Sequence, residues 1–102
     1  MSLASYNQVR KGKDMDTNMF LKNCVEMVKQ YTKDHCDKTD NVPDFDVFVV
    51  WNCKTLQNNK ALLSTTLFDG MYYEITYNGD KDEYYFDAYK KFENKCVKRI
   101  EV

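Results

Sequence analysis

The feature that most constrains the fold is a short run of strand-forming residues, 71–77, bracketed by two turn dipeptides. Asp69-Gly70 precedes the run and Asn78-Gly79 follows it. Asn-Gly and Asp-Gly are strong hairpin signals, because a type I′ turn needs positive φ at both central residues. The sequence therefore predicts a strand over 71–77 with an antiparallel neighbour on each side.

Apolar and alternating runs on either side predict three more strands, over 44–54, 60–68 and 83 to about 92. Residues 56–59 form the turn between the first two, since asparagine tolerates left-handed backbone. Alternation in the first run places five side chains on one face: Phe45, Val47, Val49, Trp51 and Cys53. We expect the last strand to continue through about Phe92 and an irregular or short extended tail to follow it, and a C-terminal helix is the alternative.

The hairpin after residue 77 has two possible loop lengths. A two-residue loop would place Glu74 opposite Glu83, and like charges directly opposite each other are unfavourable. This favours a four-residue loop. Both lengths keep the same side chains on one face, because the register shifts by an even number of residues. That face carries Met71, Tyr73, Ile75, Tyr84 and Phe86.

Residues 16–35 predict one amphipathic helix, capped at its N-terminus by Asp16 or Thr17. Its apolar positions recur at helical spacing: Phe20, Cys24, Met27, Val28 and Tyr31. Residues 36–43 are polar, end in Pro43 and form a linker. Sequential strands with short turns favour a meander. The predicted fold is α+β, with the N-terminal helix packed on a four-stranded antiparallel β-meander. The pattern leaves open which sheet face the helix covers.

Residues 1–15 are polar and show no period, so we expect a flexible leader. The start, Met1-Ser2-Leu3, is typical of an expression vector, and Met15 is a candidate native initiator. We assign residues 16–102 to a single α+β domain.

The composition argues against several classes of protein. Apolar residues make up 43% of the 102 residues, which is ordinary for a globular domain, and a net charge of −1 gives no overall basic field. The chain has no apolar run of about 18 residues, the length that spans a membrane. It also lacks the apolar region of a secretory signal. We therefore expect a cytoplasmic protein without membrane contact.

Metal, cofactor and catalytic residues are not predicted. Four cysteines without a secretory signal predict free, mostly buried thiols, with Cys24 and Cys53 in the same core. The one close Cys/His pair, His35-Cys36, lacks the ligand spacing of a zinc site. Carboxylates recur at Asp44, Asp46, Asp80, Asp82 and Glu83. Such pairs bind Mg²⁺ in hydrolases, but charged turns and strand ends are commoner for solubility alone. A small metal-dependent hydrolase is therefore the least favoured hypothesis.

The aromatic residues indicate a binding surface. Tyr72 and Tyr85 fall on the face away from Met71 and Phe86, and they are exposed if the helix covers the latter face. Phe48 is expected to extend the same surface, and lysines are candidate neighbours. The predicted binding residues are Phe48, Lys54, Lys60, Tyr72 and Tyr85. In the alternative interpretation, the lysines form a solvated edge and the tyrosines pack under the C-terminal segment.

Three segments, 47–66, 69–74 and 87–94, resemble an uncharacterised family of small proteins from phages and prophages of Gram-positive bacteria. The most specific match is the run from Trp51 to Leu56, WNCKTL. The resemblance covers residues 17–98. It implies phage origin and a cytoplasmic setting, and it brings no activity or catalytic residues.

Two functions fit these observations best. The first is a non-enzymatic phage accessory protein that binds a host or phage protein, or a second copy of itself, through the aromatic surface. The second is a single-stranded nucleic-acid-binding protein, because sheet aromatics with lysines stack bases. The near-neutral net charge weighs against the second.

Overall fold

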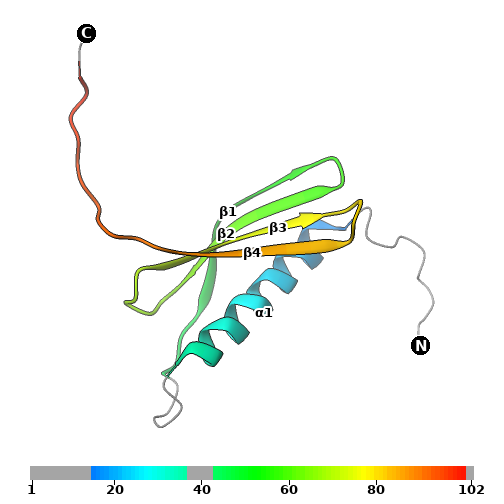
Figure 1. Cartoon of the computed structure of the whole chain (residues 1–102), viewed down its shortest axis with the longest axis horizontal. Helices are drawn as coiled ribbons and strands as arrows, with labels where there is room; N and C mark the ends of the chain where they lie inside the picture. Colours follow the sequence, from blue (N-terminus) through cyan, green and yellow to red (C-terminus); the bar gives the residue numbers. More distant parts are fainter. Residues whose placement is uncertain (1–14, 37–42, 101–102) are drawn as a thin grey trace.

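A computed structural model describes residues 15–36 and 43–100 (Figure 1). The elements follow the chain in this order: α1 (Thr17–His35), β1 (Val47–Thr55), β2 (Asn58–Thr65), β3 (Met71–Asn78) and β4 (Glu83–Lys90). The strands pair antiparallel in the order β1-β2-β3-β4, and α1 lies on one face of this sheet. The predicted fold class is confirmed. The expected leader before Met15 and linker residues 37–42 lie outside the described residues.

Helix α1 begins where the sequence predicts. The Asp16 carboxylate accepts a hydrogen bond from the Asn18 backbone N–H at 2.9 Å and so caps the N-terminus. The buried stripe runs along one side of the helix at Phe20, Cys24, Val28 and Thr32. Helical spacing brings these side chains onto the sheet, which confirms the predicted amphipathic helix.

The core lies between α1 and one face of the sheet. The fully buried side chains on the sheet are Ala61, Leu63, Tyr73, Ile75 and Tyr77. Met71, Tyr84 and Phe86 pack against the same cluster, so the predicted shared face is confirmed and is the one that α1 covers. Aromatic rings form much of the contact. Tyr31 of α1 lies 5.1 Å from Phe86 between ring centroids, and Phe86 lies 5.7 Å from Tyr73.

The hairpin between β3 and β4 has the longer loop. Asn78 pairs with Glu83, which leaves four loop residues, 79–82. The Asn78 side-chain oxygen accepts hydrogen bonds from the N–H groups of Asp80 and Lys81, an Asx turn. The expected type I′ turn at Asn78-Gly79 is wrong, because the positive φ falls on Asp82, at 53°.

A β-bulge in β1 overturns part of the predicted alternation. Val49 pairs with Leu63 and Trp51 pairs with Leu62, so Val50 is an extra residue in the strand. The side chains after the bulge change face. Trp51 and Cys53, expected in the core, are exposed on the opposite face. Alternation assumes an uninterrupted ladder, and one inserted residue reverses it.

Several predicted boundaries also move. β1 begins at Val47 rather than residue 44, and β2 ends at Thr65 rather than residue 68. The turn between them is Leu56-Gln57 alone, because Thr55 pairs directly with Asn58. β4 ends at Lys90, and residues 91–100 have no regular secondary structure. The irregular tail is therefore confirmed, and the alternative of a C-terminal helix is wrong.

Leu56 occupies a position that suits glycine, because its φ is 55°. A side chain in left-handed backbone costs about 1–2 kcal/mol, and glycine recovers this at an entropic cost of about 0.5–1 kcal/mol. The leucine side chain is 82% exposed, so little packing is lost. We expect Leu56→Gly to raise the free energy of unfolding in urea by about 0.5–1 kcal/mol. Lys81→Gly, in a loop position with ordinary φ, is the control. Equal destabilisation by both changes would contradict the prediction.

Candidate binding face

The sheet face away from α1 is built of cross-strand rows. The first row runs from Phe48 through Ser64 and Tyr72 to Tyr89, one residue from each strand. Successive side chains alternate between faces, so these four share the face opposite the core. The Ser64 hydroxyl donates to the Met71 carbonyl at 2.7 Å, which leaves the aromatic rings as the main outward groups of the row.

Two further rows complete the face. The second carries Trp51, Leu62, Glu74 and Asp87, and the third carries Cys53, Lys60, Thr76 and Tyr85. We define the aromatic face by its apolar and aromatic members in the three rows: Phe48, Trp51, Leu62, Tyr72, Tyr85 and Tyr89. Phe48, Trp51, Tyr85 and Tyr89 are each between 42% and 52% exposed. Such a concentration of exposed aromatic surface is characteristic of interaction sites.

Hydrogen bonds hold the hydroxyl groups of Tyr85 and Tyr89 in position. Lys60 Nζ lies 3.3 Å from Glu74 Oε2, and the Tyr89 hydroxyl donates to Glu74 Oε1 at 3.3 Å. The Tyr85 hydroxyl donates to Glu83 Oε1 at 2.6 Å. This hydrogen bond raises the pKa of Tyr85, and the negative charges of Asp87 and Glu74 raise the pKa of Tyr89. Both phenols therefore remain neutral hydrogen-bond donors at physiological pH.

The structure brings together four of the five predicted binding residues. Phe48, Tyr72, Tyr85 and Lys60 all lie on the outer face. Lys54 does not, because it pairs with Asn59, whose side chain is buried in the core. Its ammonium group donates to the Leu56 carbonyl at the hairpin tip, at 2.8 Å.

Sequence reasoning missed three members of the face, Trp51, Leu62 and Tyr89. Tyr89 lies four residues after Tyr85, so continued alternation along β4 would have found it. Trp51 had no such signal, because the bulge at Val50 is not visible in the pattern.

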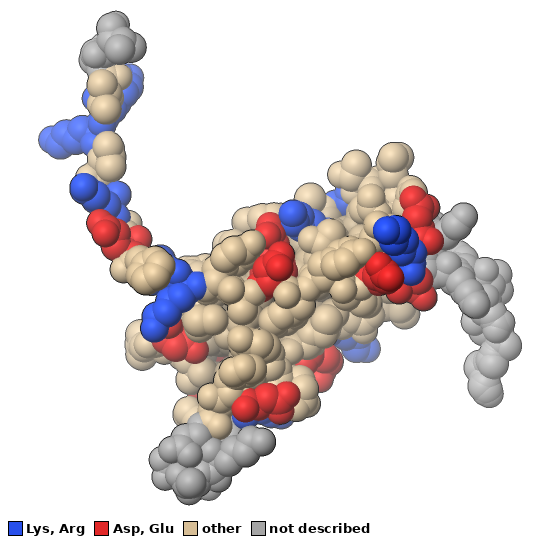
Figure 2. Space-filling model, in the orientation of Figure 1, with Lys and Arg blue, Asp and Glu red and all other residues tan. Residues whose placement is uncertain are grey.

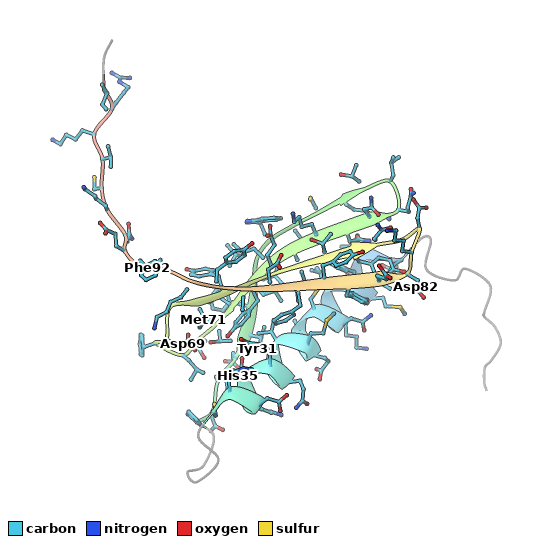
Figure 3. The ribbon with its side chains drawn as sticks, in the orientation of Figure 1. Tyr31, His35, Asp69, Met71, Asp82 and Phe92 are labelled. Atoms are coloured by element: carbon cyan, nitrogen blue, oxygen red, sulfur yellow. The ribbon has the colours of Figure 1, made fainter. Side chains whose placement is uncertain are left out.

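The tyrosines are not covered by the C-terminal segment. Lys91 Nζ lies 5.8 Å from the centroid of the Tyr72 ring, within range of a weak cation–π interaction. Beyond it, every residue from 92 to 100 is exposed. Figure 3 shows Phe92 where this segment leaves the sheet. The alternative in which the tail packs over the tyrosines is therefore wrong for this structure.

The carboxylates of the β3–β4 hairpin each have a separate neutral partner. Gln57 donates to both oxygens of Asp80 at 2.8 Å, and Tyr77 donates to Asp82 Oδ1 at 2.7 Å. Glu83 accepts from Tyr85. Within residues 15–36 and 43–100, three or more His, Cys, Asp or Glu side chains do not gather into a group that could hold a metal ion.

The cysteines differ in environment. Cys24 is buried beneath α1, and burial raises the pKa of its thiol from 9.0 to about 12. Cys36 is partly buried, whereas Cys53 and Cys96 are exposed. The expectation of mostly buried thiols is wrong, because the bulge turns Cys53 outward and Cys96 belongs to the exposed tail. His35 stacks on Tyr31 at the end of α1, with ring centroids 4.0 Å apart (Figure 3).

The fold and the face define a small α+β protein whose sheet is covered by a helix on one side and presents aromatic side chains on the other. The chain belongs to the family of unknown function DUF6275, whose model matches residues 21–99. An uncharacterised family is thus confirmed. Comparison with curated proteins gave no match, and comparison with solved structures gave none either.

The family match covers most of α1, all four strands and the exposed segment as far as Arg99. The exposed segment is therefore part of what the family model describes. The one long helix of the described ranges, α1, is too polar to cross a membrane, and those ranges hold no other helix that could do so.

Proposed function

We propose that this chain is a non-enzymatic binding module, encoded by a phage or prophage and acting in the host cytoplasm, which binds a protein through the aromatic face. The observation that carries the proposal is the exposure of Phe48, Trp51, Tyr85 and Tyr89 on one continuous sheet surface. Aromatic side chains are enriched in protein interfaces and account for much of their binding energy.

The construction of the face supports this role. The rings are mounted on paired strands whose other side is packed against α1, so they lose little conformational freedom on binding. Polar groups lie among them: the Lys60–Glu74 ion pair and the hydroxyl of Tyr89. A rigid apolar surface with a few hydrogen-bonding groups gives both affinity and orientation to a protein partner.

The charges on the face favour a protein over nucleic acid. Glu74, Asp87 and Glu83 lie on the outer side of β3 and β4, whereas Lys60 is engaged with Glu74. Carboxylates repel phosphate, and binding to a nucleic-acid backbone depends on neutralising phosphates with lysine or arginine. We therefore place nucleic acid among the outcomes of the test.

Replacing Tyr85 and Tyr89 by alanine is expected to reduce retention of the partner at least tenfold. The two rings are exposed, so their loss removes contact area without opening the core. Truncating two interface tyrosines costs about 1–2 kcal/mol each, and the summed loss exceeds a tenfold change in affinity. The measurement compares the proteins retained on immobilised full chain and on the double variant, at matched loading, from nuclease-treated host lysate that also contains a tagged copy of this chain.

Met19→Ala is the matched control, because Met19 is an exposed apolar side chain on α1. It is expected to leave retention unchanged. Equal retention by the wild type and the tyrosine variant would refute the proposal. Retention that disappears with nuclease, and weakens steeply as salt rises, would instead assign the face to nucleic acid.

A further inference from the structure

We infer that the aromatic face is occupied by the C-terminal arm, residues 91–100, of a second copy of this chain, so that two copies exchange arms. The inference rests on the proposed function of the face and names its partner. It begins from the arm itself, which projects away from the body of the molecule (Figure 1).

The arm carries apolar side chains in water. Phe92, Val97 and Ile100 are between 69% and 95% exposed. No residue of the stretch 91–100 is buried or even half-buried. Removing apolar side chains from water is favourable in free energy, so we expect a surface that covers this segment. The aromatic face offers a surface of the same chemistry.

The charges of the arm and the face are opposite. The arm has four basic residues, Lys91, Lys95, Lys98 and Arg99, and one acidic residue, Glu93. The outer face has three carboxylates, Glu74, Glu83 and Asp87, and one lysine, Lys60. Figure 2 shows the blue side chains gathered along the projecting segment, with separate red clusters on the body. Complementary charge of this kind orients a docking segment and suppresses wrong partners.

The arm is also long enough to cross the aromatic face. Ten residues in an extended chain span about 33 Å, whereas a strand of eight residues spans about 26 Å and four strands about 14 Å across. One arm therefore reaches across the whole aromatic face. Exchange between two copies is reciprocal, because each copy supplies one arm and one face, and the result is a closed two-fold dimer.

The start of the arm argues for a second copy rather than the same chain. The Lys91 N–H donates to the Gly70 carbonyl at 2.8 Å, and this bond continues the direction of β4 past the end of the sheet. Folding back onto its own face would need a reversal immediately afterwards. Residues 91–100 contain neither glycine nor proline, and their one turn-favouring residue, Asn94, comes three positions after Lys91. An arm that binds a second copy continues in the direction of β4 and needs no reversal.

Trp51 provides the readout, because it is the single tryptophan and lies on the aromatic face. The full chain is expected to scatter light as a dimer at high concentration. On dilution, the Trp51 emission should shift to longer wavelength as the arms dissociate. Val97→Asp with Ile100→Asp should weaken dimerisation at least tenfold, because charged groups replace the apolar contacts of the arm. Met19→Asp, a charge placed on the exposed side of α1, is the matched control and should leave the dimer intact.

Mixing two defective variants tests reciprocity. The arm variant (Val97→Asp, Ile100→Asp) has an unchanged aromatic face. The face variant (Tyr85→Ala, Tyr89→Ala) has an unchanged arm. Each alone is expected to be monomeric, and a mixture should form mixed pairs through one intact arm–face contact. Differently tagged chains and light scattering detect these pairs.

Three results would overturn the inference. A full chain that stays monomeric with Trp51 exposed would show that the arm does not dock. Burial of Trp51 that depends on the arm but not on concentration would place the arm on its own chain. A dimer whose affinity is the same in the arm variant as in the wild type would form through another surface. In each case, a protein retained from lysate in a way that depends on Tyr85 and Tyr89 would still support the proposed function. Failure of the arm exchange can therefore be distinguished from failure of the proposed function.

Discussion

Tyr77→Ala is expected to lower the free energy of unfolding by about 3–5 kcal/mol, the usual cost of removing a large buried aromatic side chain. Tyr77 is completely buried, and its ring centroid lies 4.9 Å from that of Tyr84. Its hydroxyl also donates to Asp82, the loop residue with positive φ. A domain of this size has a total stability of about 5–15 kcal/mol, so the variant is expected to be marginally folded.

Two further variants separate the ring from the hydroxyl. Tyr77→Phe keeps the ring and loses the bond to the Asp82 carboxylate, which is expected to cost about 1.5–3 kcal/mol. Tyr85→Ala removes an exposed tyrosine from the next strand and should cost less than about 1 kcal/mol. Guanidinium unfolding of the three variants measures these differences. A Tyr77→Ala variant as stable as Tyr85→Ala would contradict the described core.

Stability is expected to fall steeply above about pH 9, because buried acids in the core resist ionisation. The pKa of Cys24 rises from 9.0 to about 12 in the folded chain. The folded state thus retains a proton that the unfolded state releases, and the stabilisation is complete below pH 9 and is lost as the pH approaches 12. One such group contributes a slope of about 1.4 kcal/mol per pH unit over this window. Burial also raises the pKa of Tyr73 and Tyr77, which adds to the loss in the same direction.

Cys24→Ala isolates the thiol from the tyrosines. The variant is expected to be less stable at neutral pH, because a small cavity forms, but its stability should fall less steeply between pH 9 and pH 11. Cys53→Ala, which removes an exposed thiol, should follow the wild type. Guanidinium midpoints from pH 7 to pH 11 provide the comparison. Parallel curves for the wild type and Cys24→Ala would show that the thiol of Cys24 does not titrate with folding.

Local patterns predicted most of the architecture. The spacing from Phe20 to Tyr31 predicted α1, and the Asp16 cap predicted its start. Alternation predicted which side chains of β3 and β4 share a face, and this succeeded because their ladder is uninterrupted. The choice of the longer loop also succeeded, but the electrostatic reason for it did not hold, because the observed register places Glu74 opposite another carboxylate, Asp87.

The candidate binding face was predicted in part, and its two largest errors have one cause. The bulge at Val50 moves Trp51 onto the face, and it moves Lys54 to the other side. A bulge depends on how β1 pairs with β2, which is a property of two strands together. Periodicity within one strand contains no sign of it. Gly70 takes positive φ, at 69°, within the predicted Asp-Gly turn, but at the other two turns the positive φ falls on Leu56 and Asp82, where the pairing requires it.

The sequence by itself determined the kinds of elements, their order and the two faces of β3 and β4, because these follow from the spacing of apolar residues and from the chemistry of short turns. Only the tertiary structure decided which of those faces lies against α1. Alternation shows which side chains share a side of a strand, but it does not show which side is buried. That depends on the total area that the helix and the sheet bury together. The same packing left Phe48, Tyr72, Tyr85 and Tyr89 facing outward, on the face that we propose as the binding surface.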